Sequence, residues 1–217
     1  MNYAAARHNM VENQIRTNRV TNPQVIEAMD AVPREVFVPN QLRGVAYVDK
    51  AVELGGCRYL MDPTQFARLL QTADIQSSDV VLDIGPATGY SAAVLSRLAS
   101  TVVAVESDAD LAARATTLLA ELNVDNVALV TGPLSAGDAA HGPYDVIVVE
   151  GAVAAVPDAL VAQLSDGGRL VAVVNDANGV GRATVIVRVG ETVSSRVVFD
   201  TQASILPGFE ARPAFVF

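Results

Sequence analysis

The sequence predicts an α/β fold in which a mostly parallel, seven-stranded sheet ends in an antiparallel hairpin. Residues 80–106 read as strand, small-residue turn, helix and strand, which together make one βαβ unit. Short runs rich in Val and Ile, typical of strands buried on both faces, then alternate with helical stretches to about residue 174. Two further β-rich runs are separated only by Gly190 and Glu191. They must pair antiparallel, because a parallel crossover needs about a dozen residues or more.

The composition is that of a single globular domain. The chain has 217 residues, of which 51% are hydrophobic, and this is enough to fill one core. Its net charge of -9 disfavours a nucleic-acid partner, because phosphates would be repelled. Cys57 is the only cysteine, which excludes an internal disulfide and a cysteine-built metal site. Because we find neither a secretory signal pattern nor an apolar run of membrane-spanning length, we expect a cytoplasmic protein without a membrane partner.

The first third of the chain is expected to precede the βαβ unit as a mainly helical extension. Asn22 before Pro23 is a helix start signal, because the side chain can cap the helix and proline wastes no amide hydrogen in the first turn. We expect this extension to pack across the mouth of the site. Its predicted elements are helices at 4–17 and 23–31, an extended passage at 34–39, a short helix at 41–47, a strand at 51–56 and a loop at 57–63.

The remaining elements follow from apolar periodicity and turn residues. A helix from Pro63 carries apolar side chains on one face and leads into the strand at Val80. Ser107 or Asp108 would cap the helix that follows the βαβ unit. The other predicted elements are helices at 108–122 and 157–164 and strands at 126–131, 144–150, 169–174, 184–189 and 192–199.

The turn of the βαβ unit has the features of a nucleotide-binding loop. Gly85 and Gly89 let backbone approach backbone or ligand without a Cβ in the way, and Ala87 is the next smallest choice. Glu106 ends the second strand about 20 residues later, where an acid can accept hydrogen bonds from both ribose hydroxyls. The alternative is a tight strand-to-helix turn followed by a solvated strand end. The combination of strand, turn, helix, strand and acid favours the nucleotide site.

The third glycine position of a dinucleotide fingerprint is occupied by Tyr90. Asp83 at the end of the first strand is also unfavourable beside a pyrophosphate, because like charges would meet in a poorly solvated turn. A cationic or zwitterionic ligand suits these residues better. S-adenosylmethionine has a sulfonium, an ammonium and a ribose, and would match Asp83 and Glu106. The pattern Asp-x-Gly-x-x-x-Gly-Tyr resembles the first motif of class I methyltransferases, and this resemblance implies S-adenosylmethionine as cofactor.

Over most of its length the chain resembles one family, the protein-L-isoaspartate (D-aspartate) O-methyltransferases. Several independent motifs occur in the family's order, which makes the resemblance specific. The matching stretches are 31–39 with 46–49 as the amino-terminal signature, 81–91 as the cofactor motif, 144–149, and 164–171.

The resemblance implies a single Rossmann-like class I methyltransferase domain over 1–217. Residues 1–62 would form the helical extension and the substrate-side loop, and residues 63–217 the cofactor-binding core. The implied reaction is protein repair, in which the free carboxylate of an isoaspartyl residue takes the methyl group of S-adenosylmethionine. A carboxylate is ionised at neutral pH, so the site needs to position the reactants and exclude water rather than supply a strong base. The implied partners are proteins or peptides that contain isoaspartyl residues.

The loop before Pro63 departs from the family. There the family reads roughly glycine, threonine, isoleucine, serine, glutamine, proline, and the serine hydroxyl lies beside the reacting carboxylate. Aligned on Pro63, Met61 stands at the serine position, and a thioether cannot donate a hydrogen bond. Asp62 would repel an anionic substrate unless it is turned away or protonated. We take Arg58, Tyr59, Met61 and Asp62 as the candidate catalytic residues.

A second departure concerns the adenine end of the cofactor. Gly132-Pro133-Leu134 stands where the family usually has glycine-aspartate-glycine, and Pro133 cannot replace the aspartate; Asp138 is a possible substitute. Glu150 ends the fourth strand on the ligand-bearing edge and is either a pocket residue or a solvated strand end. The candidate cofactor-binding residues are Asp83, Gly85, Ala87, Gly89, Tyr90, Glu106, Gly132, Pro133, Leu134 and Glu150.

Three functions are compatible with these residues. In the first, the chain methylates isoaspartyl carboxylates and Tyr59 or Arg58 supplies the missing donor. In the second, it methylates another substrate, such as an unidentified small molecule, and Asp62 serves as base for a nucleophile that starts out neutral. In the third, it binds S-adenosylmethionine as a structural or sensory ligand without turnover. The oligomeric state does not follow from the sequence.

Overall fold

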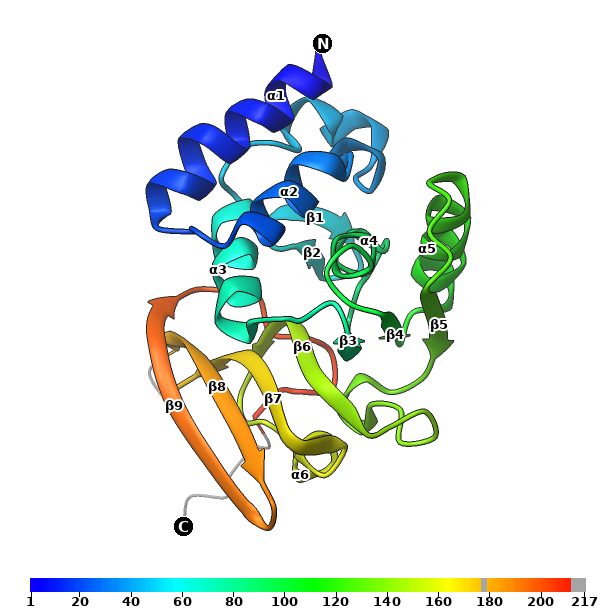
Figure 1. Ribbon diagram of the computed structural model, residues 1–217. Coiled ribbons are helices and arrows are strands. Elements are labelled where there is room, and N and C mark those ends of the chain that lie inside the picture. Colours follow the sequence, from blue (N-terminus) through cyan, green and yellow to red (C-terminus); the bar gives the residue numbers. More distant parts are fainter. Residues whose placement is uncertain (177–178, 212–217) are drawn as a thin grey trace, which may run out of the picture.

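A computed structural model of the protein describes residues 1–176 and 179–211 and has a seven-stranded sheet at its centre (Figure 1). The strand order is β5-β4-β3-β6-β7-β8-β9; the first five are parallel, whereas β8 runs antiparallel to both of its neighbours. The predicted fold class is therefore confirmed. The strands are β3 (Val80–Ile84), β4 (Thr101–Glu106), β5 (Val127–Thr131), β6 (Tyr144–Val153), β7 (Leu164–Asn175), β8 (Gly181–Val189) and β9 (Thr192–Thr201).

The longer helices begin where the sequence offers a capping side chain. Asn22, Asp62 and Asp108 each accept a hydrogen bond from a backbone amide in the first turn of the helix that follows. The α-helices are α1 (Tyr3–Met10), α2 (Pro23–Ala31), α3 (Pro63–Ala73), α4 (Tyr90–Leu95), α5 (Ala109–Glu121) and α6 (Asp158–Val161). Single-turn or irregular helices cover Val11–Ile15, Arg16–Asn18, Arg34–Val36, Asn40–Val45 and Leu134–Ala136. No helix in the described residues is both long and apolar enough to cross a bilayer.

Side chains of the central strands alternate between two apolar clusters, one on each face of the sheet. Along β3, Val81 belongs to one cluster and Leu82 and Ile84 to the other. The first cluster also contains Met29 and Phe37 of the N-terminal extension. In Figure 1, α1 and α2 lie together at the top, above α3 and the small hairpin of β1 (Val52–Gly55) and β2 (Arg58–Leu60). The single-domain organisation stays a prediction, but a cluster shared by both parts of the chain supports it.

Arg34 connects the extension to the rest of the molecule. Its side chain is fully buried; Nε donates to the carbonyl of Ala46 at 2.7 Å and Nη2 to the carbonyl of Met61 at 2.6 Å. The guanidinium also lies 4.9 Å from the ring centroid of Tyr90, within the range of a cation–π contact. Burial lowers the pKa of Arg34 below its usual value. A second link is the hydroxyl of Thr88, which donates to the carbonyl of Phe37 at 2.6 Å.

Several predicted boundaries were wrong. The passage at 34–39 is not extended throughout, because amides of Val36 and Phe37 bond back three residues and close a single helical turn. The loop at 57–63 contains a short strand, β2 (Arg58–Leu60), that pairs antiparallel with β1 (Val52–Gly55). The helix at 157–164 ends at Val161, and β7 begins at Leu164 with a bulge that needs the left-handed backbone of Gly167 (φ 79°).

We expect Arg34→Met to lower the free energy of unfolding by about 2 to 6 kcal/mol, because two buried carbonyls would lose their donor at about 1 to 3 kcal/mol each. Urea unfolding at pH 7 measures this change. Arg97→Met is the matched control, since Arg97 is exposed, and should change stability by less than about 0.5 kcal/mol. An equal effect of both substitutions would show that Arg34 does not connect the extension to the core.

Candidate active site

The candidate site lies at the carboxyl ends of β3, β4 and β6. Asp83 is near the end of β3, and Glu106 is the last residue of β4. The prediction that the strand ends at Glu150 was wrong, because β6 continues to Val153; Glu150 nevertheless lies at this edge, since it follows Val149, the partner of the last residue of β3. This edge is where ligands bind in parallel α/β sheets. The structure therefore brings the three acids to one edge of the sheet, and their role in binding a cofactor stays a prediction.

The turn after β3 brings the backbone close to Glu106. Gly85 (φ 82°) and Gly89 (φ 96°) have left-handed backbones, and a Cβ on Gly89 would lie only 3.1 Å from the Cβ of Ala115 in α5. Ala87 also has a positive φ, 52°, and its amide donates to Oε2 of Glu106 at 2.8 Å. The small residues therefore close a turn and at the same time build one wall of the site.

Glu106 is fully buried and is not a solvated strand end. Besides the amide of Ala87, the amides of Ser107 and Asp108 donate to Oε1 at 2.8 and 3.0 Å. These three donors hold the carboxylate in one orientation at the mouth of the turn. A buried carboxylate held in this way can accept further hydrogen bonds from a pair of hydroxyls or from a cation.

Arg58 provides those further donors. It is the first residue of β2, yet its guanidinium reaches Glu106: Nη2 donates to Oε2 at 2.9 Å and to the Gly85 carbonyl at 3.0 Å, and Nη1 donates to Oε1. Only 3% of the side chain is exposed. Arg58 was predicted only as a substrate-side residue; it lines that pocket and is also paired with Glu106. The pairing was missed because 48 residues separate the two partners.

Asp83 and Glu150 form a second acidic wall. Asp83 is fully buried; Ser91 donates to Oδ2 at 2.7 Å, whereas Oδ1 has no partner among the described residues. Burial raises the pKa of Asp83 to about 7, and the charge of Glu106 adds to the increase, while Ser91 and Arg58 oppose it. Burial and the charge of Asp83 also raise the pKa of Glu150, whose Oε1 is buried without a partner in the described chain. This wall suits a positively charged or hydrogen-bond-donating ligand.

The predicted catalytic loop faces a narrow pocket beside these acids. Tyr59 is 37% exposed, whereas Met61 is buried. Asp62 caps α3 by accepting from the amide of Gln65 at 2.9 Å. Its carboxylate is therefore occupied at a helix N-terminus, although burial still raises its pKa. The pocket is lined by Ala51, Cys57, Arg58, Tyr59, Met61, Asp62, Glu150, Gly151, Gln202, Ala203, Ser204, Ile205 and Leu206.

The last residues in this lining were missed by sequence reasoning. The amide of Leu206 donates to the Ala152 carbonyl at 2.9 Å, so the segment after β9 runs beside the end of β6. A Cβ on Gly151 would lie 2.7 Å from Leu206, and one on Gly85 would lie 3.3 Å from it. Leu206 thus closes the site from the C-terminal side. Two apolar residues before Pro207, Ile205 and Leu206, are too short a run to predict this contact.

Tyr90 is a large, buried residue at the start of α4, and its predicted contact with a cofactor stays a prediction. Its ring is buried against Phe37 and Phe66, with centroid distances of 5.6 and 5.7 Å. Burial raises the pKa of its hydroxyl. Tyr90 therefore fills the space beneath the start of α4 and joins the site to the extension.

The stretch after β5 lies next to Glu106 but presents few polar groups. The amide of Gly132 donates to the Glu106 carbonyl at 3.0 Å, and Leu134 is buried in an apolar cluster. Asp138 accepts from the amide of Ala140 at 3.1 Å and pairs with His141. Asp138 is thus engaged within its own loop, and an adenine contact by Gly132, Pro133 or Leu134 stays a prediction.

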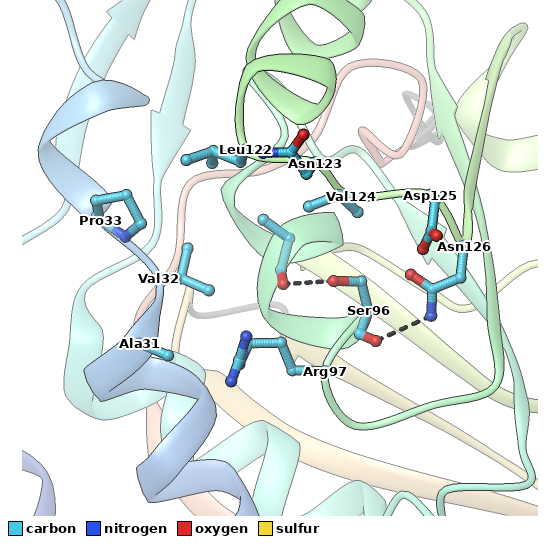
Figure 2. Close-up of a pocket in the computed structure, with 11 residues that line it drawn as sticks. Ala31, Val32, Pro33, Ser96, Arg97, Leu122, Asn123, Val124, Asp125 and Asn126 are labelled. Carbon is cyan, nitrogen blue, oxygen red and sulfur yellow. Dashed lines mark hydrogen bonds between the residues drawn. The ribbon is translucent and has the colours of Figure 1, made fainter.

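A larger hollow of about 450 Å³ lies elsewhere, between the ends of α2 and α4 (Figure 2). Its wall includes residues 122–126, just before β5 begins, so it faces the opposite edge of the sheet from the acids. Asn126 uses its side-chain amide there to donate to the Ser96 carbonyl at 2.9 Å. None of Asp83, Glu106 and Glu150 lines this hollow.

Comparison with known proteins adds independent information. A profile of the family "Protein-L-isoaspartate(D-aspartate) O-methyltransferase (PCMT)" matches residues 5–203. A protein-L-isoaspartate O-methyltransferase of Methanoculleus marisnigri is 41% identical over 166 residues, which is 76% of each chain. One of Rhodopseudomonas palustris (strain ATCC BAA-98 / CGA009) is 40% identical over 182 residues, which is 84% of each chain.

Two solved structures resemble the whole fold. A protein-L-isoaspartate O-methyltransferase superposes with a TM-score of 0.82 at 26% identity and covers 93% of this chain and 66% of the other. A putative Plasmodium falciparum protein of the same description, in complex with S-adenosyl-L-homocysteine, has a TM-score of 0.78 at 16% identity, with 95% and 98% covered. The second likeness concerns the fold alone.

Asp83→Asn should stabilise the free protein more at pH 8 than at pH 5. The folded-state pKa of Asp83 lies above its usual value, so the folded protein binds more protons than the unfolded chain, and this acid lowers stability as pH rises toward about 7. Asparagine carries no such charge. Urea unfolding at both pH values should show a gain of roughly 1 kcal/mol or more at pH 8. Asp200→Asn, at an exposed position, should show no such difference; a pH-independent effect of Asp83→Asn would contradict the prediction.

Proposed function

Because the chain belongs to the protein-L-isoaspartate (D-aspartate) O-methyltransferase family, we propose that it methylates the free carboxylate of isoaspartyl residues in proteins and peptides. Its cofactor is S-adenosylmethionine, as the family requires. The observation that carries the proposal is the acidic cradle of the buried Glu106 and Asp83 and the half-buried Glu150, directly beside the pocket lined by Cys57, Arg58, Tyr59, Met61 and Asp62. Methyl donor and acceptor would thus meet at one edge of the sheet.

The residues of the cradle fit the cofactor. Glu106, held by three backbone amides, would accept from the two ribose hydroxyls. Asp83 and Glu150 have buried oxygens without partners in the described residues, and would face the positive charges of the cofactor. When bound, S-adenosylmethionine would supply a methyl group on a positively charged sulfur. A carboxylate oxygen of the acceptor can bond to the methyl carbon while the sulfur leaves as part of S-adenosylhomocysteine. The protein would act by alignment of the two reactants and by exclusion of water.

The pocket on the acceptor side is better suited to bind a carboxylate than its sequence alone indicates. Asp62 caps α3, so its charge is partly compensated by backbone amides and is less available to repel an anion or to act as a base. Arg58 and Tyr59 line the same pocket and can donate where Met61 cannot. These points favour the isoaspartyl acceptor over a neutral nucleophile. Binding of the cofactor without turnover remains the third candidate, and turnover separates it from the other two.

We also propose a cytoplasmic location and protein or peptide partners that carry isoaspartyl residues. The pocket opens beside the exposed Tyr59, where an extended peptide could approach. The single, free cysteine is compatible with a reducing compartment.

The decisive experiment supplies the protein with S-adenosylmethionine labelled on its methyl group and an isoaspartyl peptide. We expect a base-labile methyl ester on this peptide and none on the same peptide with ordinary aspartate. Calorimetry with S-adenosylhomocysteine should be run in parallel. Binding of this product without methylation of the isoaspartyl peptide would refute the proposed acceptor and leave the cofactor assignment in place.

Met61→Ser should lower the KM for the isoaspartyl peptide by about tenfold, because a hydrogen bond to a charged group is worth about 1.5 to 3 kcal/mol. Met61→Leu is the matched control, because it keeps the volume and adds no donor, and its KM should stay unchanged. Initial rates over a range of peptide concentrations measure both. If serine and leucine behave alike, residue 61 does not contact the acceptor carboxylate.

A further inference from the structure

We propose that Arg58 is the receptor for the acceptor carboxylate, and that it becomes available only after the cofactor's ribose has displaced it from Glu106. The inference rests on the proposed function and extends it to the order of binding and to a specificity-determining residue. It starts from one observation: the carboxylate predicted to hold the ribose is already paired with a guanidinium.

The pairing excludes simultaneous binding of a ribose. Both Glu106 oxygens accept from Arg58, and the remaining space at the carboxylate is taken by the amides of Ala87, Ser107 and Asp108. Glu106 is fully buried and 3% of the Arg58 side chain is exposed, so solvent cannot share the site. Two ribose hydroxyls would therefore have to replace the two guanidinium contacts.

A displaced Arg58 needs a new partner, because an unpaired buried cation is strongly unfavourable.

The turn that precedes β2 allows Arg58 to move. Arg58 follows a turn in which Gly55, Gly56 and Cys57 all have positive φ, and nothing lies within 4 Å of the Cβ positions of the two glycines. The turn projects into open space, so the hairpin tip can shift without a clash there. Besides Arg58, the charged side chains that line the pocket are Asp62 and Glu150, both acids, and the charge of the buried Arg34 acts on both of them.

The acceptor is the ligand that completes this arrangement. Arg58 lines the pocket together with Met61, the residue that lacks a donor for the acceptor carboxylate. A guanidinium can bind a carboxylate through two parallel, charge-assisted hydrogen bonds. Asp62 is engaged with the N-terminus of α3. The oxygens of Asp83 and Glu150 that have no partner among the described residues would face the positive charges of the cofactor. Arg58 would thus exchange one carboxylate, that of Glu106, for another, that of the isoaspartyl residue, and the cofactor would bind before the acceptor.

The test compares Arg58→Gln and Arg58→Lys with the unchanged protein. Calorimetry should show that Arg58→Gln binds S-adenosylhomocysteine about tenfold more tightly, because no guanidinium has to leave Glu106. The KM for the isoaspartyl peptide should rise at least tenfold with a smaller change in kcat. Lysine keeps the positive charge but lacks the paired donors of the guanidinium, so the KM of Arg58→Lys should lie between those of Arg58→Gln and the unchanged protein. Arg196→Gln, at an exposed position of β9, should change neither quantity.

A second readout follows the hairpin itself. Cys57 is exposed at the turn, so a fluorophore can be attached there without any substitution. Its emission should change when S-adenosylhomocysteine is added to the unchanged protein and should change much less in Arg58→Gln. Weaker or equal product binding by Arg58→Gln would overturn the exchange at Glu106. Tighter product binding with an unaltered peptide KM would overturn the acceptor role and would indicate that the freed Arg58 pairs with Glu150 instead.

These readouts separate this inference from the proposed function. Product binding and the fluorescence change require no turnover, so they test the exchange at Glu106 even if the isoaspartyl peptide is not methylated. An absence of methylation by the unchanged protein would overturn the acceptor role of Arg58 together with the proposed function. Urea unfolding of each variant at pH 7 confirms that a loss of binding is not a loss of folding.

Discussion

A buried carboxylate at the end of β4 is the constraint on which the site depends. Glu106 can be kept in the interior only if donors surround it, and the chain supplies them from three directions: the turn after β3, the start of α5 and the β1–β2 hairpin. The left-handed backbone at Ala87 orients the amide of this residue so that it donates to Glu106. The guanidinium of the hairpin is the donor that a ligand can exchange, because it belongs to a side chain, whereas Ala87, Ser107 and Asp108 donate through their backbone amides.

The acceptor side depends on a second buried group of opposite charge. Arg34 binds the Met61 carbonyl from the extension, so the loop that precedes α3 is positioned by residues near the N-terminus. Tyr90 lies against the same guanidinium and belongs to the helix that follows the cofactor turn. The extension is therefore more than a cover over the site. It fixes the distance between the loop of Met61 and the start of α4.

The sequence was sufficient where the signal is local. The strand, turn, helix and strand of residues 80–106, the cap at Asn22 and the C-terminal hairpin all follow from neighbouring residues, and the structure confirms them. The cap at Asp62 could have been predicted too, because Asp62 precedes Pro63 as Asn22 precedes Pro23. Its interpretation as a possible base came from alignment with a family loop rather than from this local pattern.

The parts that could not be predicted depend on contacts between distant segments. β2 has three residues, too few for a periodicity, and forms because β1 is beside it. The side chain of Arg58 could point into the substrate pocket or beneath the turn, and only the packed structure distinguishes these directions. Leu206 closes the site through a hydrogen bond with β6, and no sequence motif predicts this contact. Ion pairs and contacts between residues far apart in sequence are thus the main features of the structure that the sequence did not predict.

Tyr90 has a consequence for how this protein could change over evolutionary time. Its ring occupies the position at which a dinucleotide-binding turn needs glycine or alanine. It is surrounded by Arg34 and Phe37 of one helical turn and by Phe66 of α3. Replacement by a small residue would open a cavity in the centre of the molecule rather than a space in the pocket. A related protein that binds a different nucleotide through this turn would need a different packing around residue 90. Ligand selectivity and the stability of the fold therefore depend on the same side chain.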